Sequence, residues 1–580
     1  KMNSTSSSSG ALLLFFSFLV LWAGGFLHIF IWTMPFYLML FGLLTFSTWY
    51  YTRRVPRRHI VKEQKSCFQR LPAITYSEEL SLGVLVGTWN VGDKKPQPSE
   101  LKDWLNVHYE HVGGSQYYDI IAVGVQECFY KVEVAGESDP CEAHWINCLR
   151  HALGDRYTLI SHLSVRESIR LCVFVKSSLE QYVSNVEIGA ETLTFPVGFR
   201  KGGTAVSFEL FDSSFCFLNC HLTAHAGLDY VAERNADIAT LFDRVRTGNK
   251  HFNISNQFHY LFWFGDLNYR FNTKSALKQK SFLSKLPFIR KTKTQSTHKT
   301  NAPDRNDIVR LIKAGEWSEL QKYDQLLDEK RKGNVLTFFL EGTQQKNKAA
   351  TFHPKFQPTY PFDQKLSVDK QFDENGDRVY LDPAKKRRVP AWCDRILVRF
   401  FPGIHCRPLT YQCYPKVLSS DHAPVNASFR VRARRYQFSP EHDAHRFVLR
   451  IMHCEIRQAY PMFNTHTQRT CTVLALHSAC MENPVSSPMV VTTNGALPQW
   501  SSECTPDMVS VPISLDMLRE QHLLVSVYDY ASTEHFFRVG QGVWSLHKLE
   551  LDEQITFSIK LQCRGVATTT LFGCFLSIRK

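Results

Sequence analysis

A chain of 580 residues is long enough for a large catalytic domain and a second domain, each with its own hydrophobic core. The formal net charge of +14 indicates an anionic partner, and nucleic acids, inositol phosphates and acidic membrane surfaces all satisfy that condition. The 16 cysteines show no Cys-x-x-Cys spacing, which argues against a disulfide framework and favours reduced thiols in a cytosolic compartment.

The first element in chain order is an apolar run. Residues 11–51 contain no Lys, Arg, Asp or Glu, and a bilayer core needs about 20 helical residues, so the run predicts one or two transmembrane helices. Gly24-Gly25 and Met34-Pro35 are candidate breaks of a hairpin, whose short spans would suit a thin membrane such as the endoplasmic reticulum. The arginines between residues 53 and 58 predict that the rest of the protein lies in the cytoplasm. The alternatives are a cleaved signal peptide, for which the run is too long, and a buried helical pair.

Between about residues 80 and 270, apolar strands alternate with helical stretches, which is the pattern of an α/β domain. Several of these strands end on polar side chains. They are residues 84–89 before Asn90, 120–125 before Gln126 and Glu127, 215–218 before His221, and 260–264 before Asp266 and Asn268. Strands that end in this way predict one polar pocket along a common edge of the sheet.

The segment Gly265-Asp266-Leu267-Asn268 is the most informative of these strand ends. Alternation along a strand places Asp266 and Asn268 on the same side. Alone, the segment is equally consistent with a turn in which both side chains bond to their own backbone. Asp394 and the pair Asp421-His422 follow other apolar segments, so the set holds carboxylates, amides and imidazoles. Such hard oxygen ligands favour Mg²⁺ over zinc.

Two basic segments follow. Between Lys274 and Lys299 lie eight Lys or Arg residues and no acidic residue, interleaved with apolar side chains. This segment is either a solvated loop or a flap that presses on an anionic membrane. Lys385 to Arg388 are four consecutive cations close to Asp394, which favours phosphate binding over a solvated face.

From about residue 445 the pattern changes to short alternating strands, which predicts an antiparallel sandwich. The order of Pro498-Gln499-Trp500, residues 524–529 and residues 539–542 resembles C2-type lipid-binding domains. Because Ala531 stands where a second loop aspartate would follow Asp529, no Ca²⁺ site is expected. An unrelated sandwich used for protein contacts is the alternative.

Nine motifs occur in the order seen in inositol polyphosphate 5-phosphatases, and this resemblance covers about residues 80 to 432. They are Trp89-Asn90, Gln126-Glu127, Lys201-Gly202-Gly203, His221-Leu222-Thr223-Ala224-His225, Arg234-Asn235, Gly265-Asp266-Leu267-Asn268-Tyr269-Arg270, Pro358-Thr359-Tyr360, Pro390-Ala391-Trp392-Cys393-Asp394-Arg395 and Ser420-Asp421-His422. The resemblance implies a DNase I-like four-layer α/β sandwich, dependence on Mg²⁺, and removal of the 5-phosphate from phosphoinositides or soluble inositol phosphates.

The resemblance also implies roles for individual residues. Asp266 would orient and deprotonate the attacking water, and Asn268 would hold the water and the phosphate. His422, kept cationic by Asp394, would contact the phosphate, as would His221. The implied metal ligands are Glu127, Asn90 and Asp421, and the implied substrate-binding residues are Lys201, Arg200, Tyr360, Lys386, Arg388, Asn235 and Arg395.

Three positions depart from the family pattern. Arg200 replaces the asparagine before Lys201, Pro361 replaces the lysine after Tyr360, and Ala423 replaces a basic residue after His422. We expect the loss of the lysine to remove one phosphate contact, for which Arg200 would compensate.

The expected organisation is a membrane anchor in residues 1–52, a basic juxtamembrane linker in 53–76, a catalytic domain in 77–432, a linker in 433–444 and a C2-like β-sandwich in 445–580. The expected function is hydrolysis of the 5-phosphate of PtdIns(4,5)P2, PtdIns(3,4,5)P3 or soluble inositol polyphosphates at a cytoplasmic membrane surface. Phosphoinositide lipids and the anionic membrane surface are the expected partners, and nucleic acid is not. The alternatives are an abasic-site DNA endonuclease of the same fold and a non-catalytic phosphoinositide-binding scaffold.

Overall fold

All described residues of the computed structural model of the chain belong to one compact unit. The described residues are 74–111, 114–193, 200–249, 252–278, 302–342, 353–374, 376–382, 388–438, 444–457, 469–493, 496–530 and 537–580. Most of the basic segment that begins at Lys274, and Lys386 within the four consecutive cations, lie outside these residues.

The predicted membrane-anchored localisation is contradicted. No helix among the described residues is both long enough and apolar enough to cross a membrane. The longest, α4 (Leu228–Arg244), has 17 residues and includes Asp229, Glu233 and Arg234, whereas a membrane span needs about 20 predominantly apolar residues. The apolar run at residues 11–51, from which the hairpin was predicted, lies outside the described residues.

Two six-stranded sheets form the centre of the catalytic domain. The first has the order β13 (Cys406–Cys413), β14 (Val425–Phe438), β1 (Ile74–Asn90), β4 (Ile120–Gln126), β6 (Ile169–Lys176) and β5 (Tyr157–Val165). The second has the order β11 (Leu340–Glu341), β12 (Asp394–Phe400), β10 (Tyr260–Asp266), β9 (Ser213–His221), β8 (Gly202–Leu210) and β7 (Val183–Thr192).

The two sheets pack face to face through one apolar core. Phe217 and Phe262, from the second sheet, have ring centroids 5.0 Å apart, and Phe262 also contacts Phe429 of the first sheet at 5.1 Å. All three side chains are at most 1% exposed. Burial on both faces explains why these strands read as continuous apolar runs and not as an alternation.

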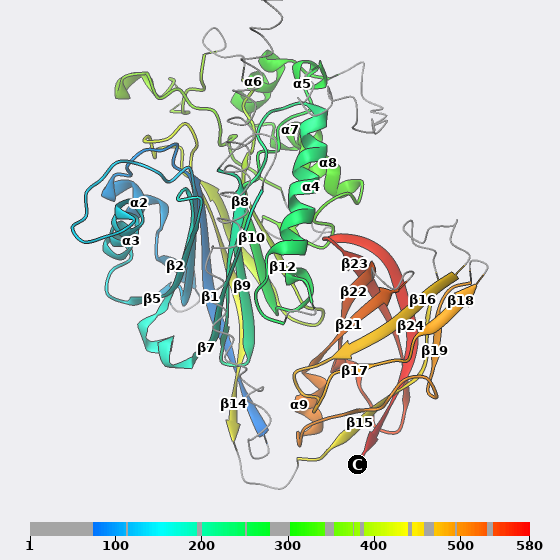
Figure 1. The fold of residues 1–580 in the computed structure, drawn as a ribbon. Helices are drawn as coiled ribbons and strands as arrows, with labels where there is room; N and C mark the ends of the chain where they lie inside the picture. The colour runs from blue at the N-terminus through cyan, green and yellow to red at the C-terminus, as the bar shows by residue number, and fades with distance from the viewer. Residues whose placement is uncertain are drawn as a thin grey trace, which may run out of the picture. The chain divides into compact units, whose positions relative to one another are not determined.

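Helices cover the outer faces of both sheets (Figure 1). α2 (Pro98–Trp104) and α3 (Pro140–Leu153) bury Trp104 and Trp145 against the first sheet. On the second sheet, α4 and α8 (Gln325–Arg331) contribute to another apolar cluster. The result is the four-layer α/β sandwich that the sequence predicted.

The strand directions explain where the polar strand ends meet. β1 is parallel to β4 and β9 is parallel to β10, so the carboxyl ends of each pair lie at one edge. Asn90 pairs with Gln126 in the first sheet, and Asp266 pairs with His221 in the second. Gly265 has a φ of 140°, and a Cβ there would lie 2.0 Å from the carbonyl oxygen of Cys220, so the position before Asp266 requires glycine.

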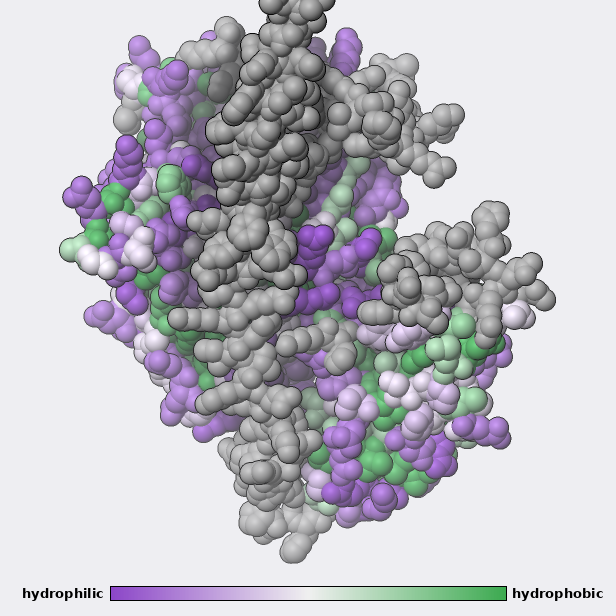
Figure 2. Space-filling model, in the orientation of Figure 1, coloured by the Kyte–Doolittle hydropathy of each residue, from purple (hydrophilic) through white to green (hydrophobic). Residues whose placement is uncertain are grey.

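The C-terminal part is an antiparallel β-sandwich, as predicted. Its sheet path is β17 (Val485–Ser486), β16 (Arg469–His477), β21 (His522–Asp529), β22 (Phe537–Ser545), β23 (Gln554–Cys563), β24 (Val566–Arg579), β15 (Phe447–Ile456) and β19 (Gln499–Ser501), with β18 (Val490–Thr493) paired to β16. The Asp529 carboxylate accepts a hydrogen bond from the Cys471 N–H at 3.0 Å. Figure 2 shows hydrophobic residues among hydrophilic ones on this domain, and Met489 and Val491 are 50% and 45% exposed.

Candidate active site

Four strand ends bring acidic, amide and imidazole side chains into contact. The Asn90 amide donates to the carboxylates of Asp266 at 3.0 Å and Glu127 at 3.3 Å. His221 Nε2 lies 3.3 Å from Asp266 Oδ2 and 3.8 Å from Glu127 Oε1. Glu127 and Asn268 have φ angles of 50° and 56°, which turn the chain sharply just after the strands end. Side chains distant in sequence thus converge at the shared edge.

Asp266 is an ionised carboxylate in a buried position. Burial opposes its charge, but the hydrogen bond from His221 and the nearby His422 and Lys201 cations hold its pKa well below the usual range. Its Oδ1 also accepts the backbone N–H of Asn268 at 3.0 Å. Because so many donors surround Asp266, it remains charged at neutral pH and is fixed in orientation.

His422 is held by a buried acid and hydroxyl. Its Nδ1 lies 2.9 Å from Asp394 Oδ2, which also accepts a hydrogen bond from the Thr359 hydroxyl at 2.6 Å. Burial disfavours the imidazolium, but the Asp394 charge and hydrogen bond outweigh it and raise the pKa of His422 to about 9. The proton on Nε2 therefore faces Asp266, whose Oδ2 lies 3.9 Å away.

Lys201 faces His221 across the site. Its Nζ is in close contact with His221 Nε2. Burial lowers the pKa of Lys201 to about 8, and burial together with the Lys201 charge lowers the pKa of His221. The same His221 Nε2 lies 3.3 Å from Asp266 Oδ2, so Lys201, His221 and Asp266 form one connected polar cluster.

Tyr360 forms a second wall of the site. Its ring centroid lies 4.3 Å from that of His422, and the Arg270 guanidinium lies 4.4 Å above the ring. Arg270 also donates to the side-chain oxygen of Asn268, and Arg388 donates to the Tyr360 hydroxyl. The sequence analysis assigned no role to Arg270. Its place as the last residue of the Gly265–Arg270 motif was the signal that could have identified it as a site residue.

The remaining predicted residues are distributed differently. Arg200 is at the rim, paired with Asp93 at 2.5 Å. Asp421 lies beside the turn after Asn90, where a Cβ on Gly92 would be 3.6 Å from its carboxylate. Asn235 is not in the cluster, because its amide donates to Glu329 at 2.7 Å and its oxygen accepts the Tyr269 hydroxyl at 2.5 Å.

Arg395 also lies apart from the site, in a fully buried ion cluster. It donates to Glu341 at 2.5 and 2.8 Å and to Asp324 at 2.9 Å, and all three side chains are 0% exposed. Adjacent residues of a strand point to opposite faces, so the same β12 that aims Asp394 at the site aims Arg395 away from it. These contacts indicate that Arg395 maintains the fold and does not bind substrate.

We expect Arg395→Ala to lower the free energy of unfolding by about 4 kcal/mol, because two buried carboxylates lose the guanidinium that pairs with both of them. Urea titration followed by tryptophan fluorescence measures the change. The matched control is Arg432→Ala, which breaks an exposed pair with Glu79 and is expected to cost less than about 1 kcal/mol. A folded Arg395→Ala variant of normal stability would contradict this assignment.

Two groups of residues offer ligand atoms to a metal ion. Asp266, Asp394 and His422 each place one within 4.8 Å of the others. A protonated His422 cannot ligate a metal, however, and its Nδ1 is engaged with Asp394. Glu127, Asn90 and Asp266 form the better set for a hard cation, because carboxylate and amide oxygens dominate it.

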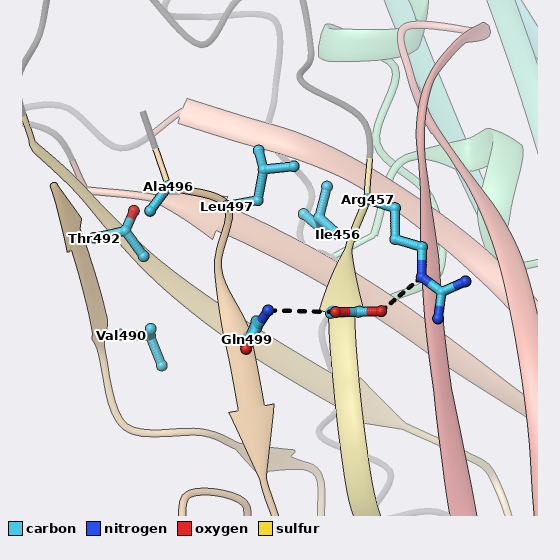
Figure 3. A pocket seen from close by; sticks show the side chains of 8 residues that line it. Ile456, Arg457, Val490, Thr492, Ala496, Leu497 and Gln499 are labelled. Atoms are coloured by element: carbon cyan, nitrogen blue, oxygen red, sulfur yellow. Dashed lines mark hydrogen bonds and ion pairs between the residues drawn. The ribbon is translucent and has the colours of Figure 1, made fainter. Parts of the chain in front are cut away.

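A cavity of about 530 Å³ lies elsewhere, in the C-terminal sandwich between β15, β18 and β19 (Figure 3). Among its lining residues, Arg457 and Gln499 donate hydrogen bonds to the Glu455 carboxylate at 2.6 and 3.3 Å, and Val490 and Leu497 are apolar. None of its lining residues belongs to the catalytic cluster. The candidate active site is therefore defined by the converging reactive side chains and not by cavity size.

The chain belongs to endonuclease/exonuclease/phosphatase family 2, whose profile matches residues 87–428. Residues 469–574 match the profile of the SHIP1/2 second C2 domain. The predicted 5-phosphatase resemblance, the DNase I-like fold and the C-terminal C2 domain are confirmed by these matches and by the relatives described next.

The chain is similar to phosphatidylinositol 3,4,5-trisphosphate 5-phosphatase 1 of Homo sapiens, with 27% identity over 84% of this chain and 37% of that protein. It is 28% identical to phosphatidylinositol 3,4,5-trisphosphate 5-phosphatase 2B of Danio rerio over 90% of this chain and 39% of that protein. A crystal structure of the inositol polyphosphate 5-phosphatase domain of SPsynaptojanin, with inositol (1,4)-bisphosphate and calcium, is 25% identical over 62% of this chain and 87% of that one, with a TM-score of 0.46. The chain thus spans less than half the length of the curated relatives it matches.

Proposed function

We propose that this chain hydrolyses the 5-phosphate of inositol phosphate headgroups, with phosphoinositide lipids or soluble inositol polyphosphates as substrates. The observation that carries the proposal is the pairing of an ionised Asp266 with a cationic His422, both buried, with 3.9 Å between His422 Nε2 and Asp266 Oδ2. An anionic base beside a cationic donor is what displacement at a phosphate monoester requires. The two named relatives, both phosphoinositide 5-phosphatases, support the same reaction class.

In this mechanism Asp266 orients the attacking water and receives its proton. Because its pKa is depressed, Asp266 is a weak base but a good hydrogen-bond acceptor. We therefore assign it chiefly to positioning the water for in-line attack. Asn268 donates a hydrogen bond to the Leu222 carbonyl and accepts one from Arg270, which fix its side chain. In this position it holds the phosphate and the water in place relative to each other. His422 Nε2 and Lys201 Nζ donate to the phosphoryl oxygens as negative charge develops there.

The donor set of Glu127, Asn90 and Asp266 fits Mg²⁺. The Asn90 amide nitrogen lies 3.3 Å from Glu127 Oε1 and 3.0 Å from Asp266 Oδ2, so it brings two carboxylates to one end of the site, and carboxylate oxygens suit a hard cation. Asp421 would support this end of the site. When bound, the ion would offset charge on the phosphoryl oxygens.

Recognition of the inositol ring would fall to the basic and aromatic wall. Tyr360 and Arg388, joined by a hydrogen bond, would hold a second phosphate on the ring, and Lys386 would join them. The C-terminal domain would contact the phosphoinositide-containing membrane surface, as the lipid-binding class of C2 domains does.

The test is phosphate release by the full chain from vesicles of PtdIns(4,5)P2 or PtdIns(3,4,5)P3 and from soluble inositol 1,4,5-trisphosphate, with and without Mg²⁺. Release of one phosphate per headgroup that requires Mg²⁺ is the expected result. Nicking of abasic-site DNA with no release from any inositol phosphate would replace the proposal with a nuclease activity.

A further inference from the structure

Arg200 occupies the rim of the site on the side of the metal-ligand loops. Its Nη1 donates to Asp93 at 2.5 Å, and its guanidinium carbon lies 5.0 Å from the centre of the Phe129 ring. Asp93 follows Asn90 by three residues, and its N–H bonds to the Glu127 carbonyl at 2.7 Å. Phe129 follows Glu127 by two residues. Both contacts therefore belong to the loops that carry Asn90 and Glu127.

Arg200 does not lie where a residue that replaces the lysine missing after Tyr360 would be expected. The lysine that the chain lacks after Tyr360 would have stood on the wall built by Tyr360, Arg270 and Arg388. Arg200 instead precedes Lys201, whose Nζ reaches His221, and its own contacts face Asp93 and Phe129. The contacts described for Arg200 are therefore with the loops that carry Asn90 and Glu127 and not with the Tyr360 wall.

The Arg200–Asp93 pair is suited to exchange partners. Its two side chains are 41% and 40% exposed, and exposed pairs contribute little to stability because water competes with them. A guanidinium presents five donors in a planar fork, and the described bond to Asp93 uses Nη1. Phe129, itself 45% exposed, holds the guanidinium plane in place at the mouth. The guanidinium is thus positioned before any anion arrives.

We propose that Arg200 is a specificity-determining residue that binds a further phosphate group beside the loops that carry Asn90 and Glu127, with Asp93 as the competing internal partner. The inference rests on the proposed function. The ligand chemistry is a phosphate ester, and its source is an additional phosphate on the inositol ring or the headgroup of a neighbouring lipid.

The experiment compares full-length wild type with Arg200→Asn, which installs the residue typical of the resembling family, and with Asp93→Asn, which frees the guanidinium. Binding and kcat/KM are measured with soluble inositol 1,4,5-trisphosphate and 1,3,4,5-tetrakisphosphate, and with PtdIns(4,5)P2 vesicles of low and high phosphatidylserine content. Arg432→Asn, which breaks a 2.6 Å pair with Glu79 at similar exposure, is the matched control.

If the ring supplies the phosphate, Arg200→Asn lowers affinity and kcat/KM about fivefold to tenfold for the tetrakisphosphate but not for the trisphosphate. Asp93→Asn should then raise affinity for the tetrakisphosphate about twofold, since the competing carboxylate is gone. If a lipid headgroup supplies it, the loss appears only on vesicles and grows with phosphatidylserine content. Either pattern supports the proposal and identifies the source.

Equal losses on every substrate, or values for Arg200→Asn that match Arg432→Asn throughout, would overturn the role of Arg200. Absence of phosphate release by the wild type from all substrates would reject the proposed function instead. In that event the binding measurements still decide whether Arg200 recognises the additional phosphate, so the two failures are distinguishable.

Discussion

We expect Asp266→Asn to lower kcat about 10³-fold while leaving substrate affinity within a small factor of the wild-type value. The substitution keeps the shape of the side chain but removes the negative charge that faces His221, His422 and the Asn90 amide. The attacking water then loses both its orienting acceptor and the acceptor for its proton. Steady-state phosphate release at saturating Mg²⁺ measures the effect.

The matched control for this variant is Asp552→Asn. Asp552 lies in a turn of the C-terminal domain with a φ of 57°, which asparagine tolerates, and it is expected to leave kcat unchanged. Near-normal turnover by a correctly folded Asp266→Asn protein would rule out the assignment of Asp266 to the water.

The second large effect is expected for Asp394→Asn. In the wild type the imidazolium of His422 is present below its pKa of about 9 and is lost as pH rises through that value. Without the Asp394 charge, burial lowers the pKa of His422, so the cation is lost at a lower pH. We expect about a 10²-fold loss of kcat/KM at pH 8, and the basic limb of the pH profile should move to lower pH.

Activity of Asp394→Asn should therefore recover in part as the assay pH is lowered, and kcat/KM profiles for both proteins measure this shift. His162→Asn is a suitable control, because His162 pairs with Glu142 at 3.6 Å outside the site and should leave the basic limb in place. An unchanged basic limb in Asp394→Asn would show that His422 is not the titrating group.

The site residues predicted best from the sequence are those whose position depends on the direction of the strand that precedes them. Apolar segments that end on Asn90, Glu127, His221 and Asp266 belong to two parallel strand pairs, and parallel strands must end at the same edge. The glycine before Asp266 was a further local signal, because a side chain there would collide with Cys220.

Membership of a motif predicted less well whether a side chain lies in the site. Asn235 and Arg395 lie within motifs of the 5-phosphatase resemblance, yet their partners Glu329, Glu341 and Asp324 are distant in sequence and carry no recognisable pattern. Alternation along β12 was sufficient to separate Arg395 from Asp394. The role of Arg270 depends on the stacking of its guanidinium over Tyr360, 90 positions further along the chain, which no local pattern reveals.

Residues 305–331 form three helices in succession, α6 (Arg305–Lys313), α7 (Trp317–Leu320) and α8. Gly315 adopts a φ of 65° between the first two, which ends the helical run, and Asp324 begins α8 by capping the N–H of Leu327 at 2.8 Å. Charge and apolar spacing alone do not show such interruptions.

The face-to-face sheets have a consequence for how activity appears during refolding. Asn90 and Glu127 follow strands of one sheet, whereas His221, Asp266 and Asp394 come from strands of the other. An intermediate that has assembled either sheet alone therefore holds half of the reactive groups and no working centre. Recovery of turnover after dilution from denaturant would report the docking of the two halves and would lag behind signals from either one.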